Sequence, residues 1–149
     1  MVYYVVNKTS GDVLDKFNSV KEAESFIKDC EWQDEINNVY SPDCYGIAQK
    51  IKFHNICEPY IAIHFSTQNQ LEKLIDYLKI YEYTYGTNDG NLNDIKELGI
   101  RYFPHDEFID NRYLSLDRSR RHCRGNYVSC GLGCDDTKYD FKDIDWNID

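Results

Sequence analysis

Two capped amphipathic helices, each preceded by strand-like segments, restrict the fold most strongly. The first begins at Ser19, where Ser19 and Glu22 form a capping box whose side chains satisfy free backbone donors. The second begins at Thr67, followed three residues later by Gln70. Apolar residues recur at helical spacing: Val20, Ala23, Phe26 and Ile27 in the first helix, and Leu71, Leu74, Ile75, Leu78 and Tyr81 in the second. Each helix is therefore expected to bury one face against a sheet.

The segments before these helices have strand character. Residues 3–6 and 13–17 are rich in β-branched and aromatic residues and flank turn chemistry at 9–12, which predicts a hairpin. Residues 45–53 and 59–65 predict two more strands, and the second alternates apolar side chains. The polar, acidic segment 30–43 predicts a loop that contains at most one helical turn. The order strand–strand–helix thus occurs twice.

The second half predicts shorter elements: strands at 83–85, 100–103, 113–116 and 127–130, and a short helix at 93–98 that ends at Gly99. Nothing marks a linker. We therefore predict a single α+β domain, residues 1–149, with an antiparallel or mixed sheet, two main helices on one face, and an acidic aromatic C-terminal tail at 135–149.

The charge excludes some function classes. The chain has 26 acidic and 17 basic side chains, and its formal net charge of −9 disfavours nucleic acid and anionic membranes as main partners.

No membrane-length apolar run or signal peptide is evident, which predicts a cytoplasmic protein whose six cysteines are mostly reduced. No cofactor is predicted.

The stretch RHCRGNYVSCGLGC, residues 121–134, raises the question of a metal site. Cys130 and Cys134 have the spacing of a zinc knuckle, and His122 and Cys123 are the nearest further ligands. Adjacent residues of a strand point to opposite faces, so His122 and Cys123 cannot both bind one ion without irregular backbone. We therefore favour a sulfur-rich scaffold. The exposed loop around His105, with two neighbouring carboxylates, is a further weak candidate for metal binding or general-base chemistry.

Arginines concentrate in residues 112–124. Arg118, Arg120, Arg121 and Arg124 could contact phosphate, but no second basic stripe supports nucleic-acid binding as the main role. Pairing of these arginines with the acidic tail is the interpretation that we favour.

Acidic residues cluster near aromatic ones in two places, a pattern typical of surfaces that contact basic proteins. The carboxylates would meet arginine and lysine, and the aromatics would anchor the contact. The predicted partner-binding residues are Glu31, Trp32, Asp34 and Glu35 in the first cluster, and Asp136, Tyr139, Asp140, Asp143, Asp145 and Trp146 in the second.

The segments YIAIHFSTQNQLEKLIDYLKIYEY (60–83) and YYVVNKTSGDVLDKFNSVKEAESFI (3–27) resemble patterns common in small bacteriophage proteins. With the small size and acidity, the chain resembles phage anti-defence proteins, including anti-CRISPR and anti-restriction inhibitors. The resemblance implies direct binding to a host nuclease, in some cases by mimicry of nucleic acid, and it assigns no functional residue.

We therefore predict a non-enzymatic inhibitor, phage-encoded, that covers the basic nucleic-acid-binding surface of a host defence nuclease. The alternatives are an immunity protein that neutralises a toxin, a small Cys/His metal-binding protein or enzyme, and a nucleic-acid binder. Exposed strand edges and thirteen tyrosines are also compatible with a dimer.

Overall fold

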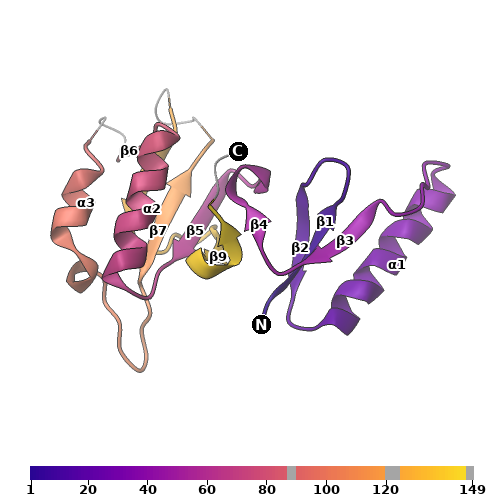
Figure 1. Ribbon diagram of the computed structural model, residues 1–149. Coiled ribbons are helices and arrows are strands. Elements are labelled where there is room, and N and C mark those ends of the chain that lie inside the picture. The colour runs from indigo at the N-terminus through magenta and orange to yellow at the C-terminus, as the bar shows by residue number, and fades with distance from the viewer. Residues whose placement is uncertain (87–89, 120–124, 147–149) are drawn as a thin grey trace. The chain divides into compact units, whose positions relative to one another are not determined.

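A computed structural model describes residues 1–86, 90–119 and 125–146 of the chain (Figure 1). It divides into two compact units. Unit 1 comprises Met1–Cys57 together with Lys142–Asp149, and unit 2 comprises Glu58–Phe141. Each unit has its own sheet, and each is described by itself.

Unit 1 is built on the predicted hairpin. Strands β1 (Tyr3–Asn7) and β2 (Val13–Phe17) pair antiparallel, and β3 (Tyr45–Ala48) joins the other edge of β1, giving the order β2-β1-β3. The Asn7 side chain accepts the N–H groups of Thr9 and Ser10 and so shapes the hairpin turn. Helix α1 (Val20–Ile36) runs alongside this sheet in Figure 1 and buries Ala23.

A second, smaller sheet completes unit 1. Strand β4 (Ile51–Lys52) is followed by a 3₁₀ turn, η1 (Phe53–Asn55), and pairs in parallel with β10 (Ile144–Asp145), which follows η3 (Phe141–Asp143). The rings of Phe53 and Trp146 stack with centroids 5.2 Å apart. Part of the segment predicted as a tail therefore lies in the structured part of unit 1.

The loop prediction for residues 30–43 is wrong over its first half, because α1 continues to Ile36. Neither glycine nor proline interrupts the helix before that point. The helix ends where Asn38 adopts a left-handed conformation (φ 58°). The N–H groups of Asn38 and Val39 bond to the carbonyls of Glu35 and Asp34, which is the Schellman arrangement.

Unit 2 contains a mixed five-stranded sheet with the order β6-β8-β7-β5-β9. Its strands are β5 (Tyr60–His64), β6 (Thr84–Tyr85), β7 (Tyr113–Asp117), β8 (Tyr127–Cys130) and β9 (Thr137–Asp140). Pairs β5–β7 and β7–β8 are antiparallel, whereas β5–β9 and β6–β8 are parallel. The α+β class with antiparallel and mixed sheets is thus confirmed.

Helices α2 (Gln68–Ile80) and α3 (Asn93–Leu98) belong to unit 2, so α1 and α2 each lie in a unit with a separate sheet. Four residues of α2 are fully buried: Leu71, Leu74, Ile75 and Leu78. The strand predicted at 100–103 is instead the 3₁₀ turn η2 (Ile100–Tyr102). It follows Gly99, whose φ of 71° reverses the chain after α3.

The N-terminal cap of α2 makes a first prediction. The Thr67 hydroxyl accepts the Gln70 N–H at 3.1 Å, and the Gln70 side chain accepts the Ser66 N–H at 2.8 Å. Thr67→Ala should therefore lower the free energy of unfolding by about 1 kcal/mol, measured by urea denaturation. Thr67→Ser, which keeps the acceptor oxygen, is the matched control and should stay close to wild type.

Candidate functional site

The solvent side of α1 presents large apolar residues. Residues of a helix advance by about 100° each, so Trp32 and Ile36 lie opposite Ala23, which the sheet side buries. Their side chains are 60% and 55% exposed. Val39 and Tyr40, just beyond the helix, are 65% and 45% exposed. We refer to Trp32, Ile36, Val39 and Tyr40 together as the α1 patch.

The backbone holds the α1 patch in a defined shape. The two Schellman hydrogen bonds, 3.1 Å from Asn38 and 2.9 Å from Val39, fasten the chain after the helix to its last turn. An apolar residue at the position of Val39 commonly packs back on the helix in this motif. Here the Val39 side chain faces solvent instead. The patch is therefore preorganised but uncovered in unit 1.

Acidic side chains surround the α1 patch. The carboxylates of Glu31, Glu35 and Asp43 raise the pKa of the exposed Tyr40 phenol, with Glu31 the largest cause. Burial raises the pKa of the Cys30 thiol, and the charges of Asp34, Asp29 and Glu31 raise it further. A region of negative potential thus lies at the C-terminal end of α1.

One of these acids has an internal role. The Tyr45 hydroxyl, on β3, donates to the Asp34 carboxylate, and this hydrogen bond raises the pKa of Tyr45 to about 12. Asp34 therefore helps to join α1 to the sheet. Within the described part of the chain, Glu31 and Glu35 form no ion pair.

The position of Glu31 and Glu35 is unfavourable for the helix itself. A helix C-terminus carries a partial negative charge and favours cations, yet the last turn of α1 contains no basic residue. Glu31 and Glu35 are also four residues apart, a spacing at which like charges repel. Helix stability does not account for these acids, which is the pattern expected when a surface serves binding.

The second predicted cluster is divided between the units. Asp136, Tyr139 and Asp140 belong to unit 2, whereas Asp143, Asp145 and Trp146 belong to unit 1. Tyr139 is only 4% exposed and donates to Glu58 at 2.8 Å, so its prediction as a surface anchor is wrong: it is a core residue of β9.

Two further acids of that cluster serve the fold of unit 2. The Asp136 carboxylate accepts the Gly133 N–H at 2.8 Å and lies 2.6 Å from the Ser115 hydroxyl. Asp140 contacts the His64 ring. Because their oxygens are held internally, they are poor candidates for contacts with arginine or lysine of a partner.

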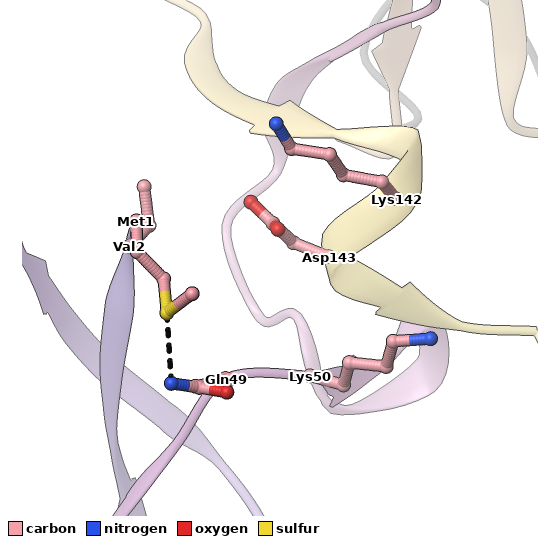
Figure 2. Close-up of a pocket in the computed structure, with 6 residues that line it drawn as sticks. All are labelled: Met1, Val2, Gln49, Lys50, Lys142 and Asp143. Atoms are coloured by element: carbon pink, nitrogen blue, oxygen red, sulfur yellow. Dashed lines mark hydrogen bonds between the residues drawn. The ribbon is translucent and has the colours of Figure 1, made fainter.

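In unit 1, Asp143 borders a hollow of about 550 Å³ that is lined by Met1, Val2, Gln49, Lys50, Lys142 and Asp143 (Figure 2). Asp143 also accepts the Tyr4 hydroxyl at 3.3 Å. In Figure 2 the ammonium ends of Lys50 and Lys142 point in different directions, so they do not converge on one ligand position. Asp145 is half-buried in β10, and Trp146 packs on Phe53.

The cysteine stretch is only partly described, because Arg120, Arg121, His122, Cys123 and Arg124 lie outside the described residues. Cys134 is exposed, and Cys130 is a half-buried thiol whose pKa burial raises. Gly131 (φ 95°) forms a turn in which the Asn111 side chain accepts the Leu132 N–H. This part of the stretch has a structural role.

Two other residues considered as binding or metal sites, Arg118 and His105, lie in unit 2. Arg118 donates to the Glu58 carbonyl and to Tyr83, and His105 lies exposed in a loop. Among residues 1–86, 90–119 and 125–146, no three His, Cys, Asp or Glu side chains are grouped so as to hold a metal ion. No helix among these residues has the length and apolarity needed to cross a bilayer.

The sequence prediction missed Ile36, Val39 and Tyr40. With Trp32 they follow the helical spacing i, i+4, i+7, i+8, a signal hidden when the segment is read as a loop.

No protein-family model matches this chain, and neither curated proteins nor solved structures include a match.

Proposed function

We propose that the protein is a non-enzymatic inhibitor that binds the basic, nucleic-acid-binding surface of another protein. The contact is made by the α1 patch and by an acidic rim that consists of Glu31 and Glu35. The observation that carries this proposal is the exposed Trp32, with three exposed apolar neighbours, beside Glu31 and Glu35, which form no ion pair in the described part of the chain.

The arrangement matches the anatomy of protein interfaces. Tryptophan and tyrosine are enriched among the residues that dominate binding energy, and a polar rim around them sets specificity and association rate. The acids of the rim complement arginine and lysine, so the preferred partner presents an apolar pocket bordered by basic side chains. A surface that normally holds a phosphate backbone has such side chains.

The resemblance of the sequence to phage anti-defence proteins makes a host nuclease the partner class to test first. In this proposal, Asp34 contributes indirectly because Tyr45 holds it. The second cluster is no longer part of the contact surface that we propose, because most of its members serve the two units internally.

The test uses two isosteric substitutions, Glu31→Gln and Glu35→Gln, made together. Wild-type and variant proteins are immobilised, incubated with lysate of the source cell or its host, and compared by mass spectrometry. A partner with a basic surface should be retained by wild type and largely lost from the variant, and its affinity should fall about tenfold, for a loss of about 1.4 kcal/mol. Added salt should slow association with wild type.

The free energy of unfolding of the same double variant should exceed that of wild type by about 0.5 kcal/mol, because the substitutions remove like-charge repulsion at a helix C-terminus. Glu24→Gln, exposed nearer the N-terminus of α1, is the matched control and should keep full binding. Equal binding by wild type and the double variant, at low and high salt, would refute the proposed electrostatic mechanism. Identity of the retained protein separates a nuclease from a toxin.

A further inference from the structure

His64, at the end of β5, lies between two carboxylates. Its Nε2 is 2.8 Å from Oδ2 of Asp110, and its Nδ1 is 3.3 Å from Oδ2 of Asp140 on β9. The His64 side chain is only 17% exposed, and its ring meets Tyr113 of β7 edge-on, with centroids 5.0 Å apart. The imidazole is thus fixed on both sides by acidic groups within unit 2.

The two contacts together depend on the protonation state of the ring. Ionised carboxylates only accept hydrogen bonds, and a neutral imidazole has a single N–H to donate. Both contacts can be hydrogen bonds only while His64 is an imidazolium. Loss of the proton leaves one ring nitrogen with its lone pair facing a carboxylate, which is repulsive.

Asp110 also forms the base of an exposed loop, residues 104–111. Its Oδ1 accepts the Arg112 N–H, and it forms an isolated β-bridge with His105. The loop extends past the end of the sheet in Figure 1. A movement of Asp110 therefore also moves the point at which the loop joins the start of β7.

The tip of this loop has a defined shape. The Asp106 carboxylate accepts the N–H groups of Phe108 and Ile109 at 2.7 and 2.8 Å. Two backbone bonds, Asp106 N–H to Ile109 and Asn111 N–H to the carbonyl of residue 104, close it. At the tip, the Phe108 side chain is 90% exposed and that of Ile109 54%. Two hydrogen bonds join the loop to residues far from it in the chain: Asp110 with His64, and the Asn111 side chain, which accepts the Leu132 N–H.

We propose that His64 is a proton-operated latch: its imidazolium ties Asp110 to Asp140, whereas the neutral ring can donate to only one of them, which loosens the 104–111 loop and changes the positions of Phe108 and Ile109. The inference concerns unit 2 and does not depend on the function proposed for the α1 patch.

The latch requires a negative charge on Asp110 and a positive charge on His64, and it is lost when either group is neutralised. Burial opposes ionisation of Asp110, but the Arg112 N–H and the neighbouring His64 outweigh it and hold the pKa of Asp110 below its ordinary value. The contribution of Asp110 is therefore present above its ordinary range and lost in strong acid. The contribution of the imidazolium is lost when the ring gives up its proton.

Other ionisable groups near His64 lie on β7, on β9 and in the loop. Tyr113 stays neutral as His64 titrates, since burial and the charges of Asp110 and Asp140 raise its pKa. The Nζ of Lys138 on β9 lies 5.9 Å from the centroid of the Tyr113 ring. His105, beside Asp110, is a second histidine in this region and must be controlled for.

The test is NMR of the full ¹⁵N-labelled chain between about pH 5 and pH 8. The amides of Phe108 and Ile109 should titrate with the same midpoint as the His64 ring. Their hydrogen-exchange rates, corrected for intrinsic pH dependence, should rise about tenfold on the basic side, as expected for loss of one charged hydrogen bond.

In His64→Gln the loop amides should lose this pH dependence and exchange rapidly throughout, whereas His105→Gln should keep it. Asp110→Asn, which leaves β5 unchanged, should reproduce the effect of His64→Gln and serves if that variant does not fold. The latch is refuted if the wild-type loop does not follow His64, or if its titration persists in His64→Gln or Asp110→Asn.

Discussion

Replacing Trp32 with alanine should weaken binding of the partner by about 30-fold or more, for a loss of about 2 kcal/mol or above. The indole is 60% exposed on the side of α1 that faces away from the sheet, so its apolar area is available to a partner and contributes little to the fold. The free energy of unfolding should therefore stay within about 0.5 kcal/mol of wild type. Calorimetric titration and urea denaturation measure the two quantities.

Ile80→Ala is the matched control for this experiment. Ile80 is 59% exposed at the end of α2, in unit 2, so the substitution removes a comparable exposed apolar side chain outside the α1 patch. It should leave the affinity unchanged. If Trp32→Ala binds as tightly as wild type, or if Ile80→Ala is equally damaging, the α1 patch is not the contact surface.

Phe65→Ala should have the largest effect on stability, lowering the free energy of unfolding by about 3 to 5 kcal/mol. Phe65 is fully buried and its ring meets that of Phe103 edge-on, with centroids 4.8 Å apart. Its removal loses the transfer free energy of the ring and leaves a cavity that close packing cannot fully collapse. Urea denaturation followed by circular dichroism measures the change.

Phe108 supplies the internal comparison, because the same substitution there removes a ring that is 90% exposed. Phe108→Ala should change the free energy of unfolding by less than about 0.5 kcal/mol. Similar losses for both variants would show that unit 2 is not organised around the core described here.

Local chemistry was the most predictable part of the fold. The capping residues Ser19 and Thr67 were identified correctly because a cap depends on a few neighbouring residues. The hairpin and α3, with its end at Gly99, were also predictable from turn chemistry. The end of α1 was not, because Asn38 is a weaker stop signal than glycine or proline and the acids before it suggest a loop.

Long-range pairing was beyond sequence reasoning. The parallel pairing of β9 with β5 joins segments far apart in the chain, and nothing local in residues 137–140 indicates it.

The same limit applies to the candidate site. Asp34, Asp136 and Glu35 look alike in sequence, yet the structure assigns the first two to internal hydrogen bonds and leaves only Glu35 on the rim.

The parallel pairing of β4 with β10 has a consequence for biosynthesis. Since Ile144 and Asp145 lie beyond all of unit 2 in the chain, a ribosome delivers every residue of unit 2 before β4 meets its partner. Unit 1 therefore cannot be completed before the whole of unit 2 has been synthesised, because β4 and β10 lie on either side of unit 2 in the sequence. Premature termination near residue 140 would then spare unit 2 and leave unit 1 incomplete, exposing Phe53 to the quality-control machinery of the cell.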